Sequence, residues 1–298
     1  IYGRKIMNDL LTIYIKNLEN DNLTKNTIEA YSRDVKRFIY FTKKRNETLE
    51  TIDCITIMAY SEHLRKDGCA NSSIARSIVS IRNYYKYLIK NDFVQNDPTA
   101  YFSIPKIKRN IPQILSIEEV DELLNQPDEL TLKGCRDKAM LELMYATGMK
   151  VSELLSITIY DINLELLYIR CNNGKKNERI IPIGTYAVRC MSLYLKIRYK
   201  INLNSLSLLF LNIKGEKMTR QGFWKIIKEY SKMTNIKKTI NSYTIRHSFA
   251  VHLLQNGAGI STVQELLGHN SMSTTQIYST IIKKNKISEI YKKTFPRA

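Results

Sequence analysis

The sequence predicts a mainly α-helical protein, with an N-terminal helical bundle followed by a larger, mostly helical domain that carries a small antiparallel sheet. Three observations predict this fold class. Apolar residues recur at helical spacing over residues 1–104. Prolines interrupt that pattern between 98 and 112, and two strand-like runs flank a polar turn in the second half. A length of 298 residues fits about two domains of ordinary size.

The first domain is expected over residues 1–104 as a bundle of helices joined by short polar turns. Its clearest helix runs from 26 to 43, where apolar side chains lie at helical spacing. Asn26 and Glu29 form a plausible cap at its start. Patterns of the same kind predict further helices over 8–18, 55–64 and 72–88.

Residues 105–113 are interpreted as a linker, because the periodicity stops there and prolines and basic residues replace it. The second domain then spans 114–298. Its first helix is predicted just after Ser116, which together with Glu119 matches a capping box. Later elements are strands at 166–170 and 179–183 on either side of the hairpin turn 172–177, and helices over 219–233, over 244–254 and again up to Tyr278.

Charge points to a polyanionic partner. The chain has 46 Lys and Arg against 28 Asp and Glu, a net charge of +18, while 44% hydrophobic residues provide enough apolar side chain for packed cores. This balance argues against a disordered basic tail and favours a nucleic-acid-binding protein. The alternative is a generally basic proteome, because Asn, Ile and Lys are abundant here in the way that AT-rich genomes enforce.

Cysteine usage and hydropathy exclude several other classes. The five cysteines are widely spaced, with no Cys-x-x-Cys pair and no nearby histidine to complete a zinc site, which fits a reducing cytoplasm. No run approaches the roughly 20 apolar residues that span a bilayer, and the N-terminus lacks a secretory pattern. A cytoplasmic protein without metal, cofactor or membrane span is expected.

Three motifs near the C-terminus are the most informative part of the chain. They read Asn241-Ser-Tyr-Thr-Ile-Arg-His-Ser-Phe-Ala250, Gln264-Glu-Leu-Leu-Gly-His269 and Ser273-Thr-Thr-Gln-Ile-Tyr278. These three motifs resemble the active-site motifs of the tyrosine recombinase (phage integrase) family, most closely those of its Xer subgroup. The resemblance extends to 136–148 and to 296–298, so it spans nearly the whole chain. It implies a SAM-like core-binding domain followed by the family's catalytic domain.

The resemblance assigns catalytic roles that fit the chemistry of the residue types. Tyr278 is the expected nucleophile, because a tyrosine hydroxyl can store a phosphodiester bond as a covalent ester without ATP or metal. Arg246 is an expected clamp on the phosphate oxygens, and His269 occupies a third family position. Lys175 on the hairpin is the expected proton donor to the departing 5′-oxygen, with Lys176 as the competing register.

Two positions depart from the family pattern. Lys150 stands where the family has its first catalytic arginine, within Gly148-Met-Lys-Val-Ser-Glu-Leu154. Lysine keeps the positive charge but lacks the planar guanidinium that can bind two phosphate oxygens at once, so a slowed enzyme is expected. Tyr243 stands where the family usually has histidine. It can donate a hydrogen bond to phosphate but cannot act as a base near neutral pH, so proton handling is expected to pass to His269 or to water.

Other charged residues have two readings each. Glu153 and Asp137 either orient Lys150 and neighbouring positive charges or form plain salt bridges. His247 is either a catalytic residue or a buried structural partner. Basic residues of both domains either contact DNA phosphates or are merely solvated. The residues in this DNA-binding set are Arg33, Arg76, Arg82, Lys106, Lys108, Arg109 and Arg220.

The implied function is site-specific recombination of double-stranded DNA through a 3′-phosphotyrosyl intermediate and a Holliday junction, carried out by a homo- or hetero-tetramer. The Xer-like text favours resolution of chromosome or plasmid dimers. The alternatives are a mobile-element integrase, a catalytically weakened DNA-binding relative and a type IB topoisomerase. Residues 283–295 have the apolar spacing of a short amphipathic helix. The resemblance implies that this tail docks into a neighbouring protomer; the alternative is that it packs on its own domain.

Overall fold

The computed structural model describes residues 2–21, 23–104, 112–172, 178–201 and 206–269, together with 271, 272, 274–279, 281 and 282. The chain divides into two compact units, Ile1–Arg109 and Asn110–Ala298. Within the described part of the chain, no helix is both long enough and apolar enough to cross a membrane.

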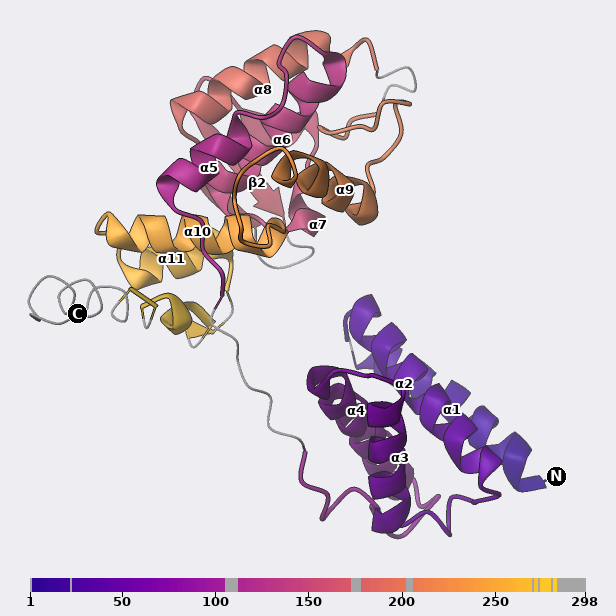
Figure 1. The fold of residues 1–298 in the computed structure, drawn as a ribbon. Helices are drawn as coiled ribbons and strands as arrows, with labels where there is room; N and C mark the ends of the chain where they lie inside the picture. Colours follow the sequence, from indigo (N-terminus) through magenta and orange to yellow (C-terminus); the bar gives the residue numbers. More distant parts are fainter. Residues whose placement is uncertain are drawn as a thin grey trace, which may run out of the picture. The chain divides into compact units, whose positions relative to one another are not determined.

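The described residues of the first unit form four helices. They are drawn in indigo to purple in Figure 1. They are α1 (Tyr2–Asn20), α2 (Lys25–Lys44), α3 (Cys54–Lys66) and α4 (Asn71–Lys90). All four helices expected from the apolar spacing are present, each extending beyond its predicted range. Helix α4 packs against α2 and α3, and α1 packs against α2. Tightly buried aromatic rings fill the core, among them Tyr14, Phe38, Tyr60 and Tyr85.

The predicted cap of α2 is wrong. The N-cap is Thr24, whose extended backbone precedes the helix and whose Oγ1 accepts a hydrogen bond from the Thr27 amide at 3.3 Å. Threonine satisfies one of the unpaired amides of the first turn in the same way that asparagine would have done two residues later. Asn26 therefore lies inside the first turn.

The second unit is mostly helical and is built around α6, which is buried along nearly its whole length. Helices α8 and α10 pack against α6, and α10 also contacts α11. Up to Leu267 the helical elements are α5 (Ile117–Leu124), α6 (Leu132–Thr147), α7 (Val151–Leu154), the 3₁₀ turn η1 (Ile159–Asp161), α8 (Thr185–Arg198), α9 (Arg220–Ser231), α10 (Ser242–Gln255) and α11 (Ile260–Leu267). Residues 274–279 are helical as well, as expected for the segment that ends near Tyr278.

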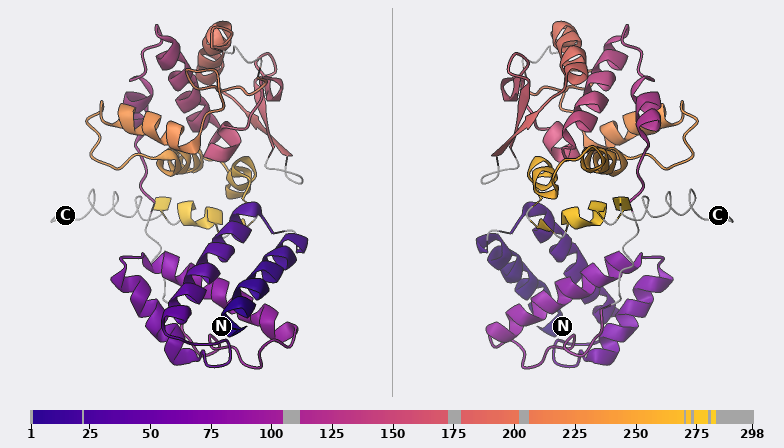
Figure 2. Two further views of the ribbon diagram at one scale, coloured as in Figure 1. Left: turned by 90° about the vertical axis from the view of Figure 1, so that its right-hand side faces the viewer. Right: turned by 90° about the vertical axis from the view of Figure 1, so that its left-hand side faces the viewer.

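A three-stranded antiparallel sheet lies at one edge of this unit (Figure 2). Strand β2 (Tyr168–Asn172) is central, between β1 (Ile162–Asn163) and β3 (Glu178–Pro182). The predicted hairpin strands are confirmed with slightly shifted ends, whereas β1 was not expected. Alternation along the strands buries Ile169 and Cys171 of β2 against the helices.

Helix caps fix where the second unit's helices begin. Ser116 and Glu119 form the predicted capping box, with the Ser116 amide donating to Glu119 Oε2 at 2.7 Å and the Glu119 amide donating to Ser116 Oγ at 3.2 Å. Thr219 caps α9 through its side chain alone, with Oγ1 accepting a hydrogen bond from the Gly222 amide at 3.0 Å. Asn241 caps α10 by accepting two amide hydrogen bonds, which sets the start of the helix that carries Arg246.

Candidate active site

Two helices end next to each other at left-handed glycines. Gly148 ends α6 at φ 57°, and Gly268 ends α11 at φ 62°. Both backbone conformations favour glycine, because an L side chain there meets its own backbone. The two helix ends present carbonyl oxygens, with their partial negative charge, to one point in space.

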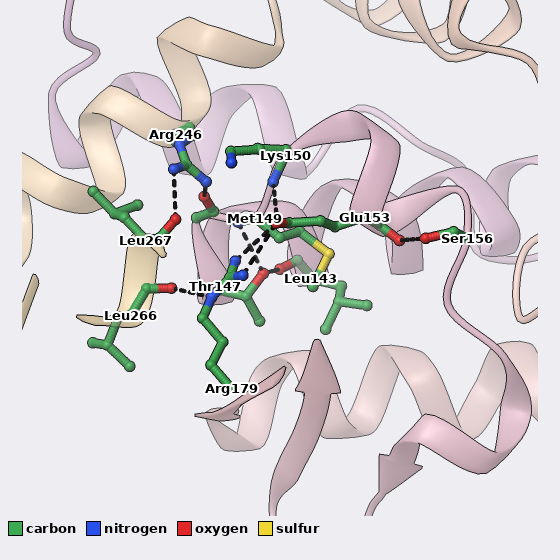
Figure 3. Close-up of polar contacts among 11 residues, drawn as sticks. Leu143, Thr147, Met149, Lys150, Glu153, Ser156, Arg179, Arg246, Leu266 and Leu267 are labelled. Atoms are coloured by element: carbon green, nitrogen blue, oxygen red, sulfur yellow. Dashed lines mark hydrogen bonds and ion pairs between the residues drawn. The ribbon is translucent and has the colours of Figure 1, made fainter. Parts of the chain in front are cut away.

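Arg246 of α10 occupies that point. Its Nη1 donates to the Gly148 carbonyl at 2.5 Å and its Nη2 to the Leu267 carbonyl at 2.7 Å (Figure 3). The side chain is only 5% exposed. Burial lowers the pKa of Arg246, but a guanidinium stays charged at any physiological pH. The two carbonyls therefore hold a buried positive charge in one fixed orientation.

Lys150 begins α7 immediately after the Gly148 turn. Its backbone amide donates to Glu153 Oε2 at 2.8 Å, and Figure 3 shows its side chain extending toward Arg246. The Glu153 carboxylate is also paired with Arg179 of β3. Lys150 thus brings a second positive charge beside Arg246. The hydrogen bond from its amide to Glu153 fixes the position of its backbone.

Arg179 links the sheet to this turn. Its two Nη atoms donate to the two Glu153 oxygens at 3.1 and 2.8 Å, and its Nε donates to the Leu266 carbonyl at 2.8 Å. Burial would raise the pKa of the Glu153 carboxyl, but the hydrogen bonds from Arg179 and Lys150 outweigh it and hold that pKa below its usual value. Arg179 was not among the site residues expected from the sequence. One sequence feature could have identified it: Arg179 is a charged residue on the same face of β3 as the buried Ile181.

Tyr278 lies after α11 with its side chain buried and 2% exposed. Its hydroxyl and Nδ1 of His247 form a hydrogen bond of 2.8 Å. The His269 ring stacks on the Tyr278 ring at 6.5 Å between centroids and 18° between planes. Nδ1 of His269 is hydrogen-bonded to Thr275 Oγ1 at 2.9 Å, which fixes the imidazole plane. The Tyr278 hydroxyl is therefore hydrogen-bonded to one histidine, and the Tyr278 ring faces a second.

The protonation states in this site follow from burial and the nearby cations. Burial raises the pKa of the Tyr278 phenol, while Arg246 opposes that rise. Burial and the Arg246 charge both lower the pKa of His247. Burial, with Arg246 and Lys150 next in importance, lowers the pKa of His269 to about 4. Both imidazoles are neutral and the phenol is protonated at neutral pH.

The structure brings four of the expected catalytic residues into one site: Tyr278, Arg246, His269 and Lys150. Tyr243 is 69% exposed, and its ring stacks on His247 at 6.4 Å. The hairpin candidates Lys175 and Lys176 lie outside the described residues.

Asp137 does not lie with Lys150. It pairs with Arg136 at 2.6 Å and accepts a hydrogen bond from the Tyr230 hydroxyl at 3.1 Å, so the plain salt-bridge reading applies to it. Glu153, in contrast, contacts the Lys150 backbone directly. Within the described residues, no group of three or more His, Cys, Asp or Glu side chains could hold a metal ion.

The basic residues expected to contact DNA differ in their surroundings. Arg33 and Arg220 are exposed. Arg76 pairs with the buried Asp34 at 2.5 Å. Arg82 donates to Thr99 Oγ1 at 3.1 Å and to the Thr99 and Phe102 carbonyls, so it holds the segment after α4. The linker residues Lys106, Lys108 and Arg109 and the tail 283–298 lie outside the described residues.

Comparison with known proteins finds relatives along nearly the whole chain. Residues 113–285 match the phage integrase family, and residues 11–92 match the phage integrase N-terminal SAM-like domain. A tyrosine recombinase XerD of Halalkalibacterium halodurans is 43% identical over 283 residues, which cover 93% of each chain. A tyrosine recombinase XerD of Listeria innocua is 40% identical and covers 98% of this chain and 100% of its own.

A solved structure shares the fold. The XerH site-specific recombinase, bound to a palindromic difH substrate in a post-cleavage complex, superimposes with a TM-score of 0.75 at 22% identity. The match covers 89% of this chain and 79% of that one. With both family domains matched in order and close relatives along nearly its full length, the chain belongs to the phage integrase family and is a site-specific tyrosine recombinase of the Xer type.

Proposed function

We propose that this recombinase cuts and rejoins double-stranded DNA at a specific site, with Tyr278 as the nucleophile that forms a 3′-phosphotyrosyl intermediate. One observation carries the proposal. The Tyr278 hydroxyl is buried, hydrogen-bonded to His247 and close enough to Arg246 for that charge to act on its pKa. A buried, oriented hydroxyl beside fixed cations suits attack on a phosphodiester better than it suits core packing.

Arg246 would hold a nonbridging phosphate oxygen in the transition state. Its guanidinium is already held by the carbonyls of Gly148 and Leu267, so it needs little reorganisation when negative charge develops on the phosphate. His269 would add a ring donor on the other side of Tyr278. Lys175, or Lys176 in the alternative register, would protonate the leaving 5′-oxygen.

Lys150 would be the weaker of the two phosphate clamps. Its ammonium makes point contacts, whereas an arginine would grip two phosphate oxygens at once. Loss of one such donor costs about 2.7 to 4 kcal/mol of transition-state stabilisation, roughly a hundred- to thousand-fold in rate. We therefore expect slow cleavage with normal DNA binding.

We infer the biological role from the similarity to Xer recombinases. Two XerD proteins match at 40% and 43% identity over nearly the full chain, which supports resolution of chromosome or plasmid dimers over mobile-element integration. A tetramer on two synapsed sites would carry out the exchange through a Holliday junction. The tail 283–295 would dock between neighbouring protomers.

Trapping the covalent intermediate tests the nucleophile. A library of nicked duplexes prepared from the protein's own genome lets the 5′-hydroxyl fragment diffuse away, so each cleavage event leaves a covalent protein–DNA adduct. We expect adducts with the wild-type protein, enriched in one sequence, and none with Tyr278→Phe. DNA binding by Tyr278→Phe in a native shift assay should be nearly unchanged, because affinity comes from many Lys and Arg contacts. Adducts that persist in Tyr278→Phe contradict the assignment.

A further inference from the structure

We propose that His247 accepts the proton of the Tyr278 hydroxyl during DNA cleavage, through its ring nitrogen Nδ1, and returns that proton when the strand is rejoined. This role rests on the proposed function, because it assigns one step of the same reaction.

The hydrogen-bond geometry singles out His247. Its Nδ1 lies 2.8 Å from the Tyr278 oxygen, and the two rings lie 5.5 Å apart at 55°. Within the described part of the chain, His247 is the one residue hydrogen-bonded to that hydroxyl. A proton can pass directly between the two atoms, without an intervening water.

The other basic group nearby is arranged differently. His269 lies face to face with the Tyr278 ring, and its Nδ1 is occupied by the Thr275 hydroxyl. Stacking places the imidazole plane nearly parallel to the phenol plane, at 18°. That orientation suits a contact with substrate beside the tyrosine better than an in-plane hydrogen bond to the tyrosine oxygen.

His247 is also in the right charge state. Burial and the adjacent Arg246 lower its pKa, so the ring is neutral at neutral pH and Nδ1 has a free lone pair when Nε2 carries the proton. Burial raises the pKa of the phenol, so Tyr278 does not ionise without help. Full transfer before attack would be uphill. The proton therefore moves as the phosphorus–oxygen bond forms and the negative charge passes to the phosphate.

The atoms of the step balance as follows. The Tyr278 oxygen bonds to phosphorus while its proton moves to His247 Nδ1. The bond between phosphorus and the 5′-oxygen breaks, and that oxygen takes a proton from the hairpin lysine proposed above. Rejoining runs in reverse: the 5′-hydroxyl attacks phosphorus, and the imidazolium of His247 returns its proton to the departing tyrosine oxygen.

Tyr243 occupies the position where the family usually has histidine, so another residue must accept the proton. The side chain of Tyr243 cannot accept a proton near neutral pH, and it is largely exposed. His247 lies one helical turn further along α10, on the same face, and the two rings stack at 6.4 Å. A histidine thus lies beside the nucleophile although the expected histidine position holds tyrosine.

Single-turnover cleavage of the nicked duplex recovered with the adduct tests the role. We expect His247→Ala to cleave roughly a hundred- to ten-thousand-fold more slowly with unchanged DNA binding, the range typical of a lost general base. Added imidazole should restore part of the rate. With a ring-fluorinated tyrosine at position 278, the fall in cleavage rate caused by His247→Ala should be smaller, because a more acidic phenol depends less on a base.

Two further variants separate proton transfer from positioning and from folding. His247→Asn keeps a polar atom near Nδ1 but cannot take a proton, so it should be as slow as His247→Ala while melting close to the wild type. His252→Ala removes a buried histidine of the same helix that is hydrogen-bonded to Tyr145 and the Leu115 carbonyl, and imidazole should not restore its cleavage rate.

The outcomes distinguish the two proposals. Adducts that persist in Tyr278→Phe overturn the proposed function itself. If Tyr278→Phe forms none but His247→Asn cleaves at the wild-type rate, or imidazole rescues His269→Ala and not His247→Ala, His247 is not the proton acceptor.

Discussion

Glu153 and Arg179 form a buried, two-pronged ion pair, with Nη1 to Oε1 at 3.1 Å and Nη2 to Oε2 at 2.8 Å. Their side chains are 2% and 9% exposed. The same carboxylate accepts the Lys150 amide, and the same guanidinium donates to the Leu266 carbonyl. The pair therefore joins the sheet, the start of α7 and the end of α11, where the Leu267 carbonyl holds Arg246.

Removing the charge of Glu153 should destabilise the second unit. Glu153→Gln leaves Arg179 buried without its counter-charge, and breaking a buried pair in this way costs about 3–5 kcal/mol. Urea unfolding would measure the loss. The control is Glu229→Gln, which removes the exposed partner of Lys133 in the same unit and should cost under about 1 kcal/mol. Equal losses in the two variants would contradict the structural role of the buried pair.

A methyl group at Gly148 should disturb the turn that holds Arg246. The backbone there has φ 57°, and an added Cβ would lie 2.2 Å from Phe249 Cδ1. Left-handed strain of about 1–2 kcal/mol and overpacking of about 1–3 kcal/mol should lower both stability and cleavage. Gly257→Ala is the control, because its φ is also positive but nothing lies within 4 Å of the added Cβ. If both variants lose the same stability, backbone strain alone accounts for the effect.

The helices described in the first unit could be predicted because each buries an apolar stripe in the aromatic core. Helix α6 was given no predicted range, and it is buried along nearly its whole length rather than on one face. Strand β1 was missed because two residues carry no period, and its pairing with β2 depends on tertiary contact. The cap of α2 was misplaced because Thr24 and Asn26 are both good capping residues, and sequence alone does not choose between neighbouring candidates.

The site was only partly predictable for a related reason. Tyr278, Arg246, His269 and Lys150 could be singled out because each stands in its own short motif that resembles the family pattern. The Arg179–Glu153 pair and the His247–Tyr278 hydrogen bond join residues 26 and 31 positions apart, and neither has a local signal that separates it from ordinary packing.

The two basic residues Arg33 and Arg82 of the first unit should behave differently when replaced by alanine. Arg33 is exposed on α2, so Arg33→Ala should weaken DNA binding and reduce its salt dependence with little change in melting temperature. Arg82 is bonded to Thr99 and Phe102, so Arg82→Ala should lower the melting temperature. Native shift assays at two salt concentrations measure the DNA binding of both variants, and thermal melts measure their stability. A lower melting temperature for Arg33→Ala alone would reverse these roles.

Lys150→Arg should accelerate cleavage at least about tenfold, because a planar fork beside Arg246 restores a two-point grip on the phosphate. DNA binding should barely change. The matched exchange Lys133→Arg, at an exposed ion pair on α6, should leave the rate as it is. Unchanged or slower single-turnover cleavage by Lys150→Arg would mean that the surrounding site has adapted to lysine.

His269 should make the folded protein sensitive to acid. Burial and the nearby cations hold its pKa at about 4 in the folded state, against 6.5 when unfolded. Between these values the unfolded chain binds more protons than the folded chain, so the free energy of unfolding falls as the pH falls from about 6.5 to about 4. His269→Asn removes this contribution.

Comparison of the two proteins cancels the remaining titrating groups, including Asp137 and Glu142, whose pKa values burial raises. We therefore expect the stability advantage of the wild type over His269→Asn to shrink between about pH 7 and about pH 5, as measured by urea midpoints at each pH. An advantage that is constant across this range would show that His269 titrates normally in the folded state, and that the cations of the site do not act on it.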